Sequence, residues 1–154
     1  MRIATVKVMN ERFAIPLEQV QEFDLSMSYT QIEGTPKEIA GLATRRGQLV
    51  TLIDMRYCLY QKETSPLERF KVVMIESNLM PDSASDLLNP VKLGNIGILV
   101  DSVEGITEVG SSEKTPAPER FKNRSVECIL EDNKEIVHLL SLASVIRAIL
   151  AKGN

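Results

Sequence analysis

The stretch TRRGQLVTLIDM at residues 44–55 combines a tight turn, a strand and the start of a helix. Gly47 follows two arginines, and glycine is favoured in short hairpin turns because it adopts positive φ without strain. The apolar stretches on either side, residues 39–44 and 48–53, predict the two strands of a hairpin. Asp54 is a good helix N-cap, so a short helix is expected over residues 54–59.

A similar succession occurs near the C-terminal end of the chain. Residues 135–142, EIVHLLSL, resemble residues 48–55, QLVTLIDM, 87 positions earlier, and they follow a turn at residues 132–134. Ser141 takes the capping place, and apolar residues at i, i+3, i+4 and i+7 predict a longer helix over residues 141–152.

A second pair of similar segments lies upstream of these two. Residues 14–20, AIPLEQV, resemble residues 97–103, GILVDSV, 83 positions later, because each is an apolar strand that ends in an acid with a valine two residues on. Two echoes in the same order at nearly equal offsets indicate two copies of one strand-rich unit. A small unit of this kind removes its exposed strand edges by closing into a barrel. The cleft between two barrels is then a candidate binding site.

The expected organisation is a single mainly β domain over residues 1–154. Its approximate repeats are residues 10–60 for the first barrel and 95–150 for the second, completed by strands at 3–9 and 70–76.

Two stretches are predicted to be surface connections. Residues 77–92 are rich in Asn, Asp, Ser and Pro, and residues 110–124 carry Pro116 and Pro118 within a charged sequence.

Composition excludes several classes of function. The net charge is −3 and aromatic residues make up 5% of the chain, so neither the basic surface nor the stacking platforms of a nucleic-acid binder are present. No apolar run approaches the roughly 18 residues that a membrane span needs, and the N-terminus reads as a strand rather than a signal peptide. Cys58 and Cys128 lack metal-ligand spacing. We therefore expect a cytoplasmic protein without metal or cofactor.

The residues of a catalytic site are also missing from the pattern. His138 is the sole histidine and lies in the middle of a predicted strand, where a structural role is expected rather than that of a base. The glycines do not form a phosphate-binding loop. Asp101 and Glu104 are interpreted as a strand end and a solvated turn. The sequence therefore predicts a protein that is not an enzyme.

The adjacent arginines in the first hairpin turn have two interpretations. A solvated turn with one arginine in an internal salt bridge explains them, and so does a display of guanidinium groups for the carboxylates of a partner. The turn of the second hairpin carries Asp132-Asn133-Lys134 instead, which shows that such a turn needs no arginine and that the arginines call for an explanation.

These same residues resemble the CheW-like chemotaxis coupling proteins. The family signature is a polar residue, any residue, Arg-Gly, an apolar strand, then Asp and an apolar residue, which residues 44–55 match. Four further segments match family elements in the right order, over about residues 2–150: Val20-Gln21-Glu22-Phe23, residues 32–41, Gly97-Ile98-Leu99-Val100-Asp101-Ser102-Val103, and the loop with Pro116 and Pro118.

The resemblance implies two five-stranded SH3-like barrels packed together, with a short helix after the first and a C-terminal helix. It implies a non-enzymatic scaffold that links methyl-accepting chemotaxis receptors to a CheA-type histidine kinase. Such a protein is cytoplasmic and is recruited to membrane-attached receptor arrays. The helical receptor tip would pack into the apolar groove between the barrels, and one barrel would dock the kinase's regulatory domain.

The same resemblance implies a receptor-binding set. Val20 would line the groove, Glu22 and Arg46 would make polar contacts beside it, and Gly47 would shape the turn. Two residues of the strand that matches downstream complete the set: Ile98 and Val100. Because the signature places its arginine at Arg46, we expect Arg46 to matter more than Arg45.

The sequence departs from the family pattern at several points. Thr51 stands where proline is usual, Thr44 where asparagine is common, and Glu127-Cys128 where a glycine is usual. The stretch 77–92 is also longer than the connection typical of the family. These departures leave open which receptor or kinase is the partner and whether both are engaged. Two other functions also stay open, an adaptor of another array such as one that controls pilus motility, and a small enzyme that uses the cleft.

Overall fold

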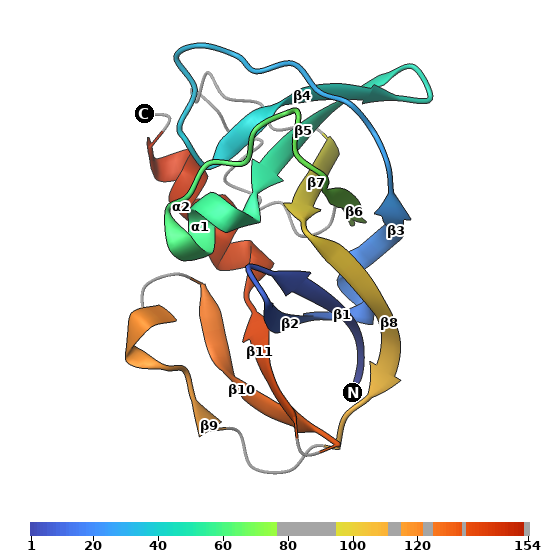
Figure 1. Cartoon of the computed structure of the whole chain (residues 1–154), viewed down its shortest axis with the longest axis vertical. Coiled ribbons are helices and arrows are strands. Elements are labelled where there is room, and N and C mark those ends of the chain that lie inside the picture. Colours follow the sequence, from blue (N-terminus) through green and yellow to red (C-terminus); the bar gives the residue numbers. More distant parts are fainter. Residues whose placement is uncertain (77–94, 111–114, 122–124, 134, 153–154) are drawn as a thin grey trace.

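A computed structural model describes residues 1–76, 95–110, 115–121, 125–133 and 135–152 of the chain (Figure 1). The described part is mainly β, as predicted. Its helical segments are the short η1 (Leu17–Gln19), α1 (Met55–Tyr60), η4 (Glu119–Phe121) and α2 (Leu142–Lys152). Its strands are β1 (Arg2–Val8), β2 (Glu11–Pro16), β3 (Val20–Leu25), β4 (Ile39–Arg45), β5 (Gln48–Asp54), β6 (Lys71–Ile75), β7 (Asn95–Val100), β8 (Ser102–Glu108), β9 (Thr115–Pro116), β10 (Val126–Asp132) and β11 (Glu135–Leu140).

These strands form two sheets. Sheet A has six strands in the order β8-β1-β2-β11-β10-β9, and sheet B has five in the order β3-β6-β7-β5-β4. Most neighbours are antiparallel, but β2 pairs parallel with β11 and β7 pairs parallel with β5. The predicted ranges 10–60 and 95–150 therefore do not coincide with the sheets. The chain exchanges strands, because β2 joins sheet A before β3 enters sheet B, and β7 joins sheet B before β8 enters sheet A.

The two hairpins predicted from their turns and adjoining apolar stretches are confirmed. The β4–β5 hairpin leads into α1, and the β10–β11 hairpin leads into α2. Asp54 caps α1 by accepting a hydrogen bond from the Tyr57 N–H at 3.4 Å, and Ser141 accepts one from the Ser144 N–H at 3.3 Å. Both helices therefore start where their caps predict.

Neither sheet closes into a complete hydrogen-bonded ring among the described residues. Sheet A ends at β8 and β9, and sheet B ends at β3 and β4. The two five- to six-stranded sheets of the predicted fold are thus present, but closure of each barrel is not. Instead of closing separately, the sheets pack on each other and share a core.

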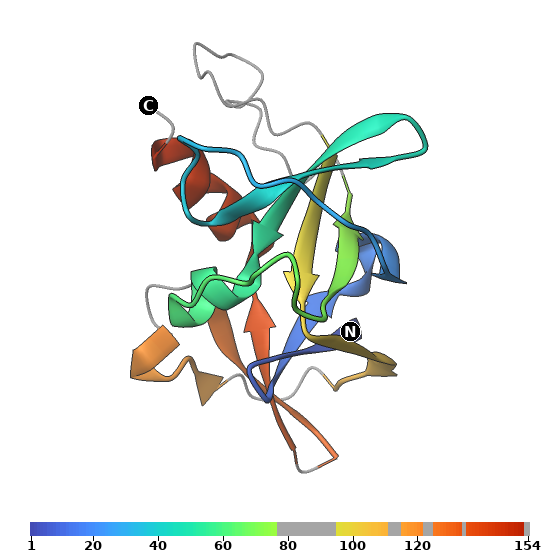
Figure 2. The ribbon, with the colours of Figure 1, turned by 45° about the horizontal axis from the view of Figure 1, so that its top comes forward.

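A shared hydrophobic core holds the two sheets together. Phe13 and Ile15 from sheet A belong to one buried cluster with Ile98 and Val100 from sheet B and with the apolar face of α2. Residues of α2 that belong to this core are Leu142, Val145, Ile146, Ile149 and Leu150. In Figures 1 and 2 the two helices lie on one side of the molecule, and β3 and β8 lie on the opposite side. No helix among the described residues is long and apolar enough to cross a membrane.

Two local predictions are wrong. Residues 102–108 form strand β8, so Glu104 lies in a strand rather than in a solvated turn, and its carboxylate accepts a hydrogen bond from Arg12 at 2.8 Å. Within the predicted surface connection 110–124, Phe121 is only 1% exposed and belongs to the shared core. The other predicted connection, 77–92, lies outside the described residues.

Candidate partner-binding surface

All six predicted site residues lie in sheet B or its β4–β5 turn, but only four of them are at least partly exposed. Val20 and Glu22 lie on the edge strand β3, and Arg46 and Gly47 form the β4–β5 turn. Ile98 and Val100 do not join them. Each is 1% exposed in β7, which lies between β5 and β6, so neither side chain faces outward.

Val20 lies at the start of β3, directly after η1, and pairs with Ile75 of β6. Its side chain is half-buried and packs against the shared core. Val103, 83 positions later, is also half-buried against that core, at the start of β8. Strands β3 and β8 contact each other although they belong to different sheets. The two valines therefore mark the matching ends of two edge strands where the sheets meet. We name this junction the β3–β8 groove, after the groove that the sequence predicts between the two barrels.

Charged side chains lie beside this groove. Glu22 accepts a hydrogen bond from Arg45 Nη2 at 2.5 Å, and Arg46 Nη1 lies 3.8 Å from the other carboxylate oxygen of Glu22. The hydrogen bond from Arg45 holds the pKa of Glu22 below its usual value. The side chain of Arg45 is 26% exposed and that of Arg46 is 78% exposed. Arg45 thus forms the internal salt bridge of the first interpretation, and the largely exposed Arg46 stays a prediction for partner contact.

The turn itself explains how Arg46 is presented. Arg46 has φ 51° and Gly47 has φ 77°, so both central residues are left-handed, as a tight hairpin between twisted strands requires. A side chain at position 47 would meet nothing within 4 Å, so glycine is required by backbone conformation and not by space. Asn133 has φ 48° at the equivalent place in the second hairpin, and asparagine tolerates that conformation well.

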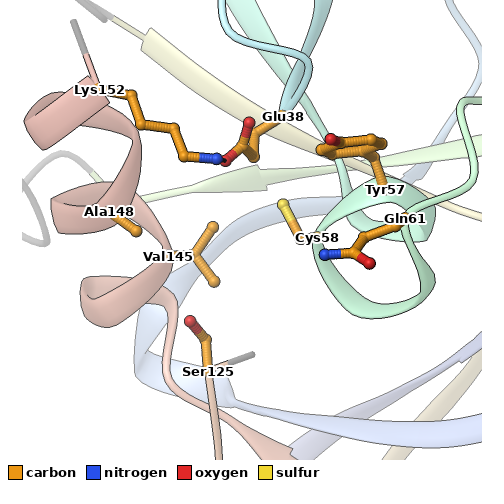
Figure 3. Close-up of a pocket in the computed structure, with 8 residues that line it drawn as sticks. All are labelled: Glu38, Tyr57, Cys58, Gln61, Ser125, Val145, Ala148 and Lys152. Carbon is orange, nitrogen blue, oxygen red and sulfur yellow. Dashed lines mark hydrogen bonds and ion pairs between the residues drawn. The ribbon is translucent and has the colours of Figure 1, made fainter. Parts of the chain in front are cut away.

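A pocket of about 310 Å³ lies on the other side of the molecule, between α1 and α2 (Figure 3). Its lining includes Cys58, and burial raises the pKa of that thiol well above its usual value, so the reactive thiolate is suppressed at neutral pH. Glu38 and Lys152, which also line it, form an ion pair with each other. The pocket therefore offers no activated nucleophile at Cys58. Among the described residues no cluster of His, Cys, Asp and Glu is arranged to hold a metal ion.

His138 has the structural surroundings that its mid-strand position predicts. The imidazole is buried in β11 beside Phe13 and Phe121, with ring centroids 5.2 and 5.1 Å away. Its Nε2 lies 3.3 Å from Glu11 Oε2, and that carboxylate also accepts hydrogen bonds from Arg120 and, at 2.7 Å, from Tyr60. Burial lowers the pKa of His138, and the negative charge of Glu11 opposes this only in part.

This burial predicts a loss of stability in mild acid. The unfolded chain binds a proton at His138 near pH 6.5, whereas the folded chain binds it only at lower pH. The free energy of unfolding is therefore expected to fall as pH decreases below about 6.5, by at most about 1.4 kcal/mol per pH unit from this group. Urea unfolding at a series of pH values between about 7.5 and 5.5 measures the slope. His138→Gln should flatten it, and an unchanged slope in that variant would assign the pH dependence to other groups.

Comparison with known proteins places this arrangement in a family. The family model described as "CheW-like domain" matches residues 2–150. The curated chemotaxis protein CheW of Klebsiella aerogenes is 28% identical over 110 residues, which cover 71% of this chain and 58% of that protein. The chain thus matches less than two thirds of that relative's length.

A solved structure gives independent support for the fold. The crystal structure of the scaffolding protein TtCheW from Thermoanaerobacter tengcongensis matches with a TM-score of 0.70 and 18% identity, over 92% of this chain and 84% of that one. At that identity the likeness concerns the fold alone. Because the family model matches nearly the whole length, the chain belongs to the family of CheW-like domains.

Proposed function

We propose that this protein is a non-catalytic adaptor that couples methyl-accepting chemotaxis receptors to a CheA-type histidine kinase. The observation that carries the proposal is the contact between edge strands β3 and β8, which places half-buried Val20 and Val103 at matching positions. On the same strand as Val20, Glu22 pairs with Arg45 and Arg46 of the β4–β5 hairpin. Membership of the CheW-like family supports the same role. The protein would act in the cytoplasm and be recruited to receptor arrays at the membrane.

The groove suits a helical partner. An amphipathic helix binds by placing its apolar face against an apolar surface, and charges at the rim fix its register. Val20 and Val103 supply apolar contact from two strands, and Arg46 extends an exposed guanidinium from the adjacent turn. The tip of a receptor's cytoplasmic helices is such a partner. The kinase would bind elsewhere, through its regulatory domain.

Co-sedimentation with receptor-bearing membranes tests this function. The purified protein should pellet with membranes that carry a chemotaxis receptor, and added kinase should pellet only when the protein is present. Membranes without receptor are the control. Failure to pellet with receptor membranes, in the presence or absence of kinase, would contradict the proposal.

Arg46 offers a test of the site within the same assay. Arg46→Glu is expected to weaken receptor binding about tenfold or more, because hydrogen bonds to charged groups contribute about 1.5–3 kcal/mol and the variant reverses the charge. Its melting temperature should change little, because the side chain is largely exposed. Arg69→Glu, an exposed arginine between α1 and β6, makes the same charge change as a control. Arg45→Gln should instead lower stability, because it removes the internal bond to Glu22. Equal binding by the Arg46 and Arg69 variants would exclude Arg46 from the site.

A further inference from the structure

Asp101 is the single residue between β7 of sheet B and β8 of sheet A, so the chain crosses from one sheet to the other at this point. Its backbone N–H donates a hydrogen bond to the Lys7 carbonyl at 2.9 Å. Its carboxylate Oδ2 accepts one from the Met9 N–H, also at 2.9 Å. Both partners belong to the β1–β2 hairpin, which fixes the crossing point to sheet A.

The other carboxylate oxygen of Asp101 binds a residue on the sheet B side of the crossing. Asp101 Oδ1 accepts a hydrogen bond from Arg56 Nε at 3.1 Å and forms an ion pair with Arg56 Nη2, also at 3.1 Å. Arg56 lies in α1, which continues directly from β5 of sheet B, and it also pairs with Glu68 on the connection toward β6. The carboxylate of Asp101 therefore links the β1–β2 hairpin of sheet A to helix α1, which follows β5 of sheet B.

The hairpin turn that Asp101 holds has an unfavourable backbone. Met9 and Asn10 have φ 52° and 69°, and methionine rarely adopts the left-handed conformation. The bond from the Met9 N–H to Asp101 thus stabilises a turn that its own sequence does not favour. This is independent evidence that Asp101 determines local geometry.

The second crossing between the sheets lacks such a link. There the chain passes from β2 through η1 to β3, and Glu18 occupies the place that Asp101 has 83 positions later. Glu18 is exposed and forms no ion pair with any described residue. An ion pair therefore links the two sheets at the β8 crossing, whereas Glu18 forms none with the described residues at the β3 crossing. The strand that Asp101 immediately precedes is one wall of the β3–β8 groove.

We propose that Asp101 is a positioning residue for the partner-binding groove, and that its carboxylate fixes the angle between the two sheets and hence the spacing of β3 and β8. The groove's role in binding rests on the function proposed above. The spacing of the strands is a property of the free protein and does not depend on that function.

Spin labels on the two strands measure this spacing directly. Cysteines replace Gln21 on β3 and Glu108 on β8, both exposed, in a background in which Cys58 and Cys128 are alanine. Asp101→Asn keeps an acceptor for the Met9 N–H but loses the charge that holds Arg56, and Arg56→Gln removes the other half of the pair. Both variants are expected to broaden and shift the distance distribution between the labels, at temperatures where a melt shows them folded.

Asp132→Asn is the matched control. Asp132 pairs with Arg12 at 3.6 Å, but both residues lie in sheet A, so this variant should leave the distance unchanged. In the co-sedimentation assay Asp101→Asn should bind receptor membranes roughly tenfold more weakly than Asp132→Asn. An unchanged distance distribution in folded Asp101→Asn and Arg56→Gln would overturn the inference. If the distances shift while the wild-type protein does not bind receptor membranes, the proposed function fails and the positioning role stands.

Discussion

Replacing Phe121 by alanine is expected to lower the free energy of unfolding by about 3–5 kcal/mol, the usual cost of removing a buried aromatic ring. The ring packs edge-on against Phe13 and Tyr60, with centroids 5.7 Å from each. The guanidinium of Arg120 lies 4.4 Å above it. These ring contacts attach η4 to β2 and α1. The alanine variant would therefore leave a cavity in the core that both sheets share. Urea unfolding at neutral pH measures the loss.

Phe23→Ala is the control for that measurement. Phe23 has the same side chain as Phe121, but it lies exposed on the edge strand β3. Its replacement should cost about 1 kcal/mol or less, because little apolar area leaves the folded interior. Equal losses in the two variants would mean that η4 is a surface connection after all.

Phe121 shows why the sequence predicted some parts of the fold and not others. The hairpins followed from local signals, namely a turn residue with apolar strands on either side and a capping residue after them. No local signal marks Phe121, because it stands alone among prolines and charged residues. Its burial depends on Phe13 and His138, which are far away in the sequence and come near only when β2 pairs with β11.

The exchange of strands between the sheets was hidden for a similar reason. The repeat at offsets of 83 and 87 correctly predicted two similar successions of elements. Which strands share a sheet depends on the parallel pairs β2–β11 and β5–β7, and these join segments that no short-range pattern connects.

For the candidate site, the sequence contained one signal that Ile98 and Val100 are buried and therefore cannot contact a partner. The stretch NIGILV at residues 95–100 is apolar without alternation, which is typical of a central strand buried on both faces. Ile98 and Val100 are accordingly in the core. No sequence signal predicted the hydrogen bond between Arg45 and Glu22. The family signature points to Arg46, and Glu22 comes near the β4–β5 hairpin only in the folded protein.

Val20→Asp is expected to weaken co-sedimentation with receptor membranes by about two orders of magnitude. A charge placed at an apolar contact without a partner costs a few kcal/mol, and about 1.4 kcal/mol corresponds to a factor of ten in affinity. Glu22, which lies on the same strand, carries the same sign and so offers the new carboxylate no compensation. Binding at several protein concentrations, at fixed receptor density, gives the change in affinity.

Stability has to be separated from binding in this variant, because Val20 also packs against the shared core. A thermal melt gives the fraction that is folded at the assay temperature, and the affinity is calculated for that fraction alone. Leu67→Asp makes the same kind of change at a side chain that is 96% exposed, between α1 and β6, and it should bind like the wild-type protein. If the affinity of folded Val20→Asp equals that of Leu67→Asp, Val20 supports the fold but does not contact the receptor. A large loss of affinity in folded protein would instead mean that the receptor helix contacts Val20 on the β3 side of the β3–β8 groove.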